Sequence, residues 1–124
     1  MKFYRCNVCG NMVGLIRSGG GELVCCEQSM EELIPGSVDA SSEKHVPDVT
    51  VEGAVVKVQI GSAVHPMLPE HHIEWVYIHT KQGGQRKKLN PGVEPKVEFL
   101  LSDGDKVLEV YEYCNLHGLW MNEM

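Results

Sequence analysis

The chain has 124 residues, of which 43% are hydrophobic and 23% are charged, which excludes a disordered or collagen-like protein and suits one domain or a domain with a small module. The formal net charge is −6, and Arg86-Lys87-Lys88 is the one basic cluster. A phosphate backbone needs a dense stripe of Lys and Arg, so we expect no nucleic-acid partner and assign this cluster to a solvated turn.

The chain contains no long apolar segment, and its first residues, Met1 to Cys6, lack the apolar core of a secretory signal. We therefore expect no membrane association and a cytoplasmic location. The five cysteines form an odd set in a compartment that keeps thiols reduced. Metal ligation or catalysis is the better explanation for them than disulfide bonds.

Residues 1–36 contain four of the five cysteines and no alternating apolar run long enough to predict a sheet. A segment of this length needs a metal, disulfides or a partner to fold alone. Ile34-Pro35-Gly36-Ser37 is typical of a turn and linker. We therefore divide the chain into a small domain at residues 1–36 and a larger one at residues 37–124.

The larger domain contains strand-length runs rich in β-branched and aromatic residues, separated by turns such as Asn90-Pro91-Gly92. The predicted strands are 54–60, 73–78, 97–101 and 107–111. No segment has a sustained 3.6-residue apolar period, so we expect little helix. The pattern predicts a mainly β fold with an antiparallel sandwich.

The first candidate metal site combines the CxxC pair Cys6 and Cys9 with the adjacent pair Cys25 and Cys26. In a CxxC turn, two thiolates converge on one ion while backbone N–H groups point at the sulfurs. Four thiolates suit zinc or a single iron equally well, so the ligand set alone leaves the metal open. The ion could serve only to hold a small domain together.

The second candidate site begins with Cys114 and His117, which lie three residues apart directly after a predicted strand. Further histidines, His45, His65 and the pair His71-His72, lie on predicted loops or at strand starts, where they can be aimed at a common point. Neighbouring residues of an extended segment point to opposite faces, so only one of His71 and His72 can reach that point.

Together these motifs resemble the superoxide reductases, and the four-cysteine block in front makes nearly the whole chain similar to desulfoferrodoxin, the two-iron form of that family. The resemblance implies a desulforedoxin-like domain with one iron bound by four cysteines, followed by an immunoglobulin-like β-sandwich. It implies a second iron, ferrous when active, with four equatorial imidazoles, one axial thiolate and an open sixth position. The matching ligands are His45, His65, His71, Cys114 and His117. His71 is preferred to His72 because the family motif leaves one residue between the ligand and Ile73-Glu74-Trp75.

The same resemblance implies the reaction, the reduction of superoxide to hydrogen peroxide by one electron. It gives Lys44 the role of attracting superoxide and helping its protonation, and Glu43 the role of closing the sixth position of the ferric ion after turnover. It implies a rubredoxin-like electron donor and a homodimer. His72 and His79 are expected to bind no metal.

Two other functions are compatible with the residues. In one, the chain is a rubredoxin-like electron-transfer protein that works through the four-cysteine iron. In the other, a structural zinc module precedes a β-sandwich that binds a partner. An open coordination position argues against a pure electron carrier, which gains nothing from exposing iron to a substrate.

Overall fold

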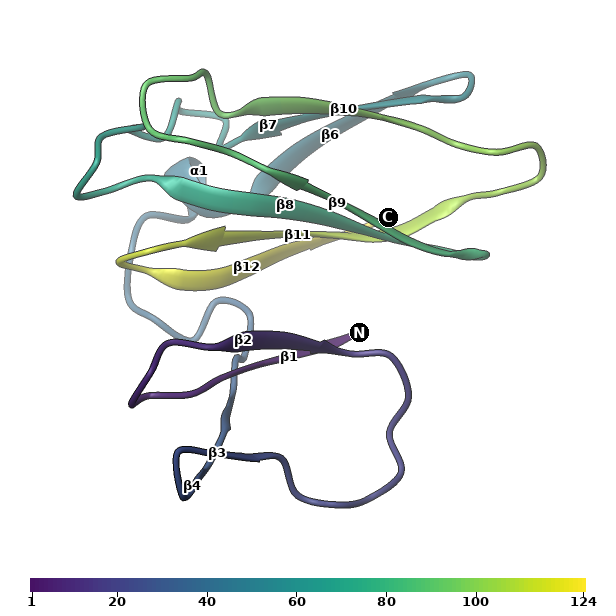
Figure 1. The fold of residues 1–124 in the computed structure, drawn as a ribbon. Helices are drawn as coiled ribbons and strands as arrows, with labels where there is room; N and C mark the ends of the chain where they lie inside the picture. Colours follow the sequence, from purple (N-terminus) through teal and green to yellow (C-terminus); the bar gives the residue numbers. More distant parts are fainter. The chain divides into compact units, whose positions relative to one another are not determined.

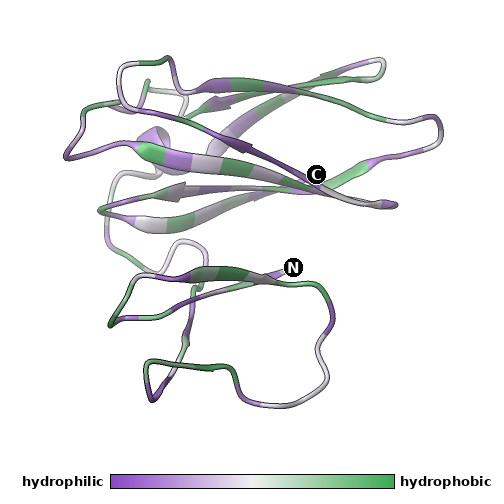
Figure 2. Ribbon diagram, in the orientation of Figure 1, coloured by the Kyte–Doolittle hydropathy of each residue, from purple (hydrophilic) through white to green (hydrophobic).

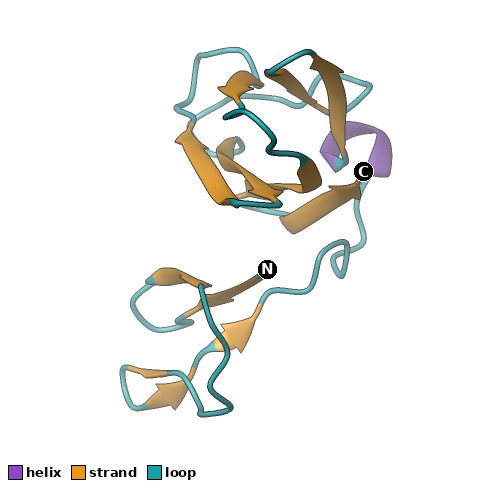
Figure 3. Ribbon diagram, turned by 90° about the vertical axis from the view of Figure 1, so that its right-hand side faces the viewer, coloured by secondary structure: helices purple, strands orange, loops and turns teal.

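The computed structural model describes residues 1–124, which form two compact units, Met1–Ile34 and Pro35–Met124. Almost all regular structure is strand, and the one helix is a single turn (Figure 3). The predicted mainly β fold is therefore confirmed. No helix is long and apolar enough to cross a membrane.

The first unit contains a three-stranded antiparallel sheet and a separate small hairpin (Figure 1). The sheet has the order β2-β1-β5, and its strands are Lys2–Arg5 (β1), Met12–Leu15 (β2) and Glu31–Glu32 (β5); the hairpin joins Val24–Cys25 (β3) to Gln28–Ser29 (β4). The expectation of no sheet here was wrong. These strands are too short to show apolar alternation, and the turns between them, rather than an apolar face, set their pairing.

The second unit is a sandwich of two antiparallel sheets with seven strands in all (Figure 1). One sheet has the order β10-β7-β6 and contains Lys96–Leu100 (β10), Val55–Ile60 (β7) and Pro47–Glu52 (β6). The other has the order β12-β11-β8-β9 and contains Gly118–Glu123 (β12), Val107–Cys114 (β11), Ile73–Thr80 (β8) and Gly83–Lys88 (β9). The helical turn α1, Ser42–His45, precedes β6.

The four predicted strands correspond to β7, β8, β10 and β11, whereas β6, β9 and β12 were not predicted. The assignment of Arg86-Lys87-Lys88 to a turn was wrong, because these residues end β9 and pair with β8. β9 lies at the edge of its sheet, so polar side chains are tolerated along it and no apolar alternation marks it.

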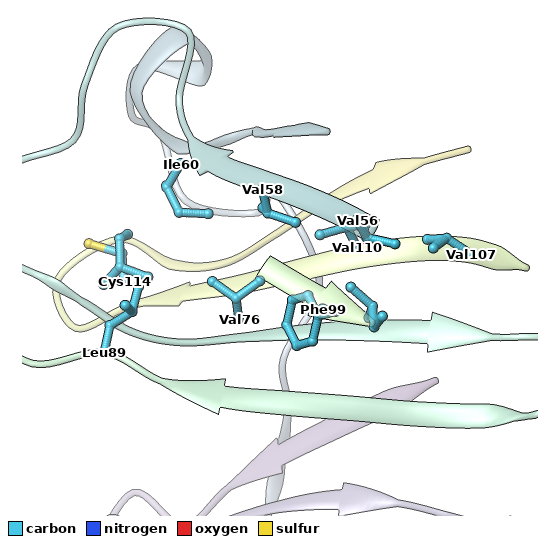
Figure 4. Close-up of a cluster of buried hydrophobic side chains, with 11 residues drawn as sticks. Val56, Val58, Ile60, Val76, Leu89, Phe99, Val107, Val110 and Cys114 are labelled. Atoms are coloured by element: carbon cyan, nitrogen blue, oxygen red, sulfur yellow. The ribbon is translucent and has the colours of Figure 1, made fainter. Parts of the chain in front are cut away.

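The core lies between the two sheets and consists largely of β-branched side chains (Figure 4). In Figure 2, green apolar stretches alternate with white and purple ones along the strands that supply it, and β2 of the first unit is also green. Cys114 lies at one end of this cluster, near Ile60 and Leu89, and is fully buried. The sandwich therefore carries a thiol into its interior at the end of β11.

Candidate metal centres

The four cysteines of the first unit converge on one point. Their Sγ atoms all lie within 4.8 Å of one another, and none forms a disulfide. The Sγ of Cys25 is 3.6 Å from that of Cys9 and 3.9 Å from that of Cys26. These lengths match the edge of a tetrahedron of sulfurs about 2.3 Å from a central ion. The donor set fits a tetrahedral metal.

Backbone geometry explains how adjacent cysteines can serve one ion. Cys26 and Glu27 are the two central residues of the hairpin between β3 and β4, and both have positive φ, 52° and 62°. Such a turn is tight enough to direct the side chains of both Cys25 and Cys26 toward the CxxC pair. That pair closes through Gly10, at φ 82°, whose N–H donates to the Cys6 carbonyl.

Backbone and side-chain N–H groups surround the sulfurs. The N–H of Cys9 donates to the Cys6 Sγ at 3.5 Å, and that of Asn11 donates to the Cys9 Sγ at 3.4 Å. Hydrogen bonds from the Cys9 and Val8 backbone lower the pKa of Cys6 to about 6. Hydrogen bonding to Cys9 and Cys6, followed by the other crowded sulfurs, raises the pKa of Cys26 to about 12. Four thiolates at this spacing therefore require a cation.

Four imidazoles of the second unit lie around one point, and we call this group the square of imidazoles. Neighbouring rings are almost perpendicular, and the centroid distances along the sides, His45–His65, His65–His71, His71–His117 and His117–His45, are 4.7, 4.7, 5.0 and 4.9 Å. The diagonal from His45 to His71 is 6.5 Å, close to the side multiplied by the square root of two. Four rings around one point produce this arrangement.

Hydrogen bonds on the outer side of the square fix which nitrogen points inward. The Nδ1–H of His45 donates to the Ser41 carbonyl and that of His65 donates to the Pro66 carbonyl, each at 2.7 Å. The Nε2 atoms of both rings then carry lone pairs, yet they lie 3.2 Å apart. Two lone pairs facing each other repel unless a cation lies between them.

The rings of His71 and His117 add two further nitrogen atoms to this site. The Nδ1 of His117 lies 3.0 Å from the Nε2 of His45. The Nε2 of His71 is buried and has no hydrogen-bond partner. A buried nitrogen without a hydrogen-bond partner is costly, so this atom is suited to bind a metal ion. The imidazole nitrogens therefore form a second set of donors that suits a metal ion, in addition to the four cysteines of the first unit.

Cys114 supplies a fifth donor from the core. Its Sγ lies with the ring nitrogens of His45, His65 and His71 in a group whose atoms are all within 4.8 Å of one another. Burial raises the pKa of the thiol, whereas hydrogen bonds from the backbone of Leu116 and His117 act to lower it. A cation at this point would overcome the effect of burial and hold the thiolate.

Three of the four imidazoles, those of His45, His65 and His71, favour the neutral form. Burial lowers the pKa of His65 to about 4 and also lowers the pKa of His45 and of His71. The positive charge of Lys44 contributes to the lower pKa of both His45 and His71. The exposed ammonium of Lys44 therefore acts electrostatically on the centre.

Of the residues predicted for this site, the structure brings His45, His65, His71, Cys114 and His117 together. Of the histidine pair, His71 lies in the square, whereas the Nδ1 of His72 lies 3.1 Å from the Leu68 carbonyl. His79 lies near the end of β8, and its Nδ1 is 2.8 Å from the Glu109 carboxylate. Glu43 and Lys44 are exposed on α1 beside His45.

Trp120, which the sequence did not mark as a site residue, supports two of the rings. Its indole stacks on His45 at 4.9 Å and 26°, and its Nε1–H donates to the His117 carbonyl at 3.0 Å. The contact with His45 joins β12 to a residue far from it in sequence, whereas His117 is three residues before Trp120. Only the proximity of Trp120 to the Cys114–His117 turn, three residues downstream, hinted at this role.

Comparison with known proteins agrees with this arrangement of sites. The family model described as desulfoferrodoxin matches residues 37–123, and the one described as the desulfoferrodoxin N-terminal domain matches residues 1–33. The chain belongs to the desulfoferrodoxin family. The resemblance noted from the motifs is thereby confirmed.

Relatives from this family cover nearly the whole chain. A desulfoferrodoxin homolog of Methanothermobacter thermautotrophicus is 44% identical over 119 residues, which span 96% of this chain and 95% of that protein. The crystal structure of the superoxide reductase from Treponema pallidum has a TM-score of 0.83 and 41% identity and covers 98% of both chains. A superoxide reductase of Pyrococcus horikoshii is 40% identical over 106 residues, 71% of this chain and 91% of that protein.

Proposed function

We propose that this desulfoferrodoxin-family protein is a superoxide reductase, an enzyme that reduces superoxide to hydrogen peroxide with one electron and two protons. The observation that carries the proposal is the square of four imidazoles with the buried thiol of Cys114 beside it. Five such donors exceed the four that zinc usually takes, and they leave one position of a six-coordinate ion for a small oxidant.

We assign His45, His65, His71, His117 and Cys114 as the residues that would hold a ferrous ion. Residues 37–124 would form this catalytic domain, and residues 1–36 a desulforedoxin-like domain that holds a second iron through Cys6, Cys9, Cys25 and Cys26. When bound, the iron of the catalytic domain supplies the electron that superoxide accepts.

The residues of the chain provide the rest of the chemistry. The positive charge of Lys44 contributes to the lowered pKa of His71. The same ammonium attracts anionic superoxide and can orient a water that delivers a proton. The carbonyls of Ser41 and Pro66 hold two rings in the tautomer that presents Nε2. Glu43, the neighbour of Lys44, would supply a carboxylate to the centre after the product has left.

Turnover consumes one electron, so an external donor must restore the reduced state of the iron. We propose that this donor is a rubredoxin-like protein.

We also expect a cytoplasmic homodimer. Large apolar side chains of the first unit, Val8, Ile16 and Val24, are more than half exposed, and Ile16 is 96% exposed. A second copy would cover them. Light scattering that gives the mass of one chain would contradict the dimer.

Metal analysis and two cysteine variants test the proposal. After anaerobic purification we expect two irons per chain, and zinc alone would contradict both iron assignments. Cys114→Ser should abolish superoxide reduction and the red-region charge-transfer band of the oxidised protein. Cys9→Ser should alter the first centre and leave superoxide reduction largely intact. If the chain is instead an electron-transfer protein that works through the four cysteines, Cys9→Ser should impair its function more than Cys114→Ser does.

A further inference from the structure

An open hollow lies beside the second centre, over the start of β8 and the end of β9. It has a volume of about 450 Å³, and its lining includes His72, Trp75, Arg86, Lys88, Leu89 and Pro91. None of the five proposed ligands lines it, so it is distinct from the coordination site. His72 is the residue next to His71, which places the hollow one residue from the square of imidazoles.

The hollow is positively charged on an acidic protein. Neither Arg86 nor Lys88 forms a salt bridge, and Glu74 is the one carboxylate in the lining. Lys87, between them, points to the opposite side of the strand, where its ammonium donates to the Glu98 carbonyl and lies 5.4 Å from the Phe99 ring. Because side chains alternate along a strand, Lys87 lies on one side of β9, and Arg86 and Lys88, which form no salt bridge, lie together on the other.

Aromatic rings connect the hollow to the proposed axial ligand. Trp75 lines the hollow, and its ring stacks almost parallel on that of Tyr113, with 5.9 Å between centroids and 10° between planes. Tyr113 is paired with Trp75 across the sheet and directly precedes Cys114. The hollow therefore reaches Cys114 through one stack and one peptide unit, and it reaches His71 through its neighbour His72.

We propose that this hollow is the surface where the external reductant docks, and that the reductant is a small acidic protein carrying a one-electron metal centre. The proposal rests on the proposed function, which requires such a donor. On docking, the donor's centre loses one electron and the oxidised catalytic centre gains one; no bond forms and no atom is transferred. The overall charge of −6 repels an acidic partner elsewhere, so the local cations select this face.

Charge reversal tests the docking step with a redox-inert probe. We would titrate zinc-substituted rubredoxin, a small acidic protein, into the isotopically labelled protein and follow backbone NMR signals at low ionic strength. Shifts should centre on His72, Arg86 and Lys88. Arg86→Glu with Lys88→Glu should weaken binding at least tenfold. The control, Lys81→Glu with Lys106→Glu, makes the same charge change at the far end of β8 and should keep affinity within about twofold.

The second arm measures electron delivery. Reduced native rubredoxin should reduce the oxidised Arg86→Glu, Lys88→Glu protein at least tenfold more slowly than the wild type, while the reaction of the reduced variant with superoxide stays unchanged. An equally large fall in the rate of reduction in the control protein, Lys81→Glu with Lys106→Glu, would mean that net charge alone controls the rate. That result would overturn the proposed docking site. Unchanged binding and delivery in the β9 variant would also overturn it. Loss of superoxide reactivity in the wild type would instead contradict the proposed function, because the zinc probe reports docking independently.

A third variant tests the aromatic stack. Trp75→Leu should slow electron delivery from bound rubredoxin without changing the affinity for the zinc form, and Trp75→Phe, which keeps a ring, should restore most of the rate. If Trp75→Leu does not fold, Trp75→Phe and the charge variants still decide the docking surface. Equal rates in both Trp75 variants and the wild type would remove the stack from the proposal.

Discussion

Asn115 and His72 are joined by two hydrogen bonds: the His72 N–H donates to the Asn115 Oδ1 at 2.9 Å, and the Asn115 N–H donates to the His72 carbonyl at 3.1 Å. A third bond runs from the Asn115 Nδ2 to the Glu70 carbonyl at 3.0 Å. The residue after Cys114 therefore clasps the backbone on both sides of His71. This clasp sets the position of one proposed ligand relative to another.

Asn115→Ala should loosen the second centre because the His72 N–H and the Glu70 carbonyl both lose their partner. The loss of supporting hydrogen bonds around a metal ligand typically lowers metal affinity about 10–100-fold. Iron retention against a chelator measures the effect, with the four-cysteine centre as an internal reference. Asn115→Asp keeps the acceptor and should lose less; equal retention in all three proteins would contradict the role of the clasp.

Gly61 should tolerate no side chain. It has φ 80°, and a Cβ built on it would lie 2.5 Å from the Ala63 carbonyl oxygen and 2.7 Å from both the Glu43 carbonyl oxygen and the Lys44 carbonyl carbon. All of these are backbone atoms, so Gly61→Ala must displace the turn that carries Glu43 and Lys44. We expect slower reaction with superoxide. Gly53→Ala, at φ 60° in open space, is the control for backbone strain alone.

Lys44→Ile should slow the bimolecular reaction with superoxide and flatten its dependence on ionic strength. The reason is that an exposed cation near the centre attracts an anion, and added salt screens this attraction. Stopped mixing at several salt concentrations measures both effects. Lys57→Ile, which removes a cation from β7, is the control. A salt profile identical to that of the wild type would contradict steering by Lys44.

Glu112→Gln should stabilise the sandwich more as the pH rises. Burial raises the pKa of Glu112 well above 4.5, and neither carboxylate oxygen has a hydrogen-bond partner. The folded form keeps the proton while the unfolded form releases it, so the wild type loses stability as the pH rises from about 4.5 toward the raised pKa. Glutamine does not titrate. Urea unfolding should give a difference that grows by up to about 1.4 kcal/mol for each pH unit between pH 4.5 and the raised pKa; a difference that stays constant with pH would refute the explanation.

Part of the fold could be predicted because its signals are local. The runs that became β7, β8, β10 and β11 face the core, so burial forces apolar residues along them. The edge strand β9 carries Arg86, Lys87 and Lys88 and shows no such pattern. Its place depends on pairing with β8 and on side-chain bonds such as that from Gln85 to the Leu100 carbonyl at 2.7 Å, which no single stretch of sequence contains.

The amino-acid sequence supplies the kinds of donor atom, because the coordination chemistry of thiolates and imidazoles belongs to the side chains, and the resemblance of its motifs to those of superoxide reductases indicates which residues carry them. Tertiary structure alone decided the rest. Folding places His45, the last residue of α1, and His71, which precedes β8, at opposite corners of one square. It also turns His72 away from this square and stacks Trp120 on His45. These relations depend on strand register and on backbone hydrogen bonds between distant segments, and they exist only once the two sheets have packed.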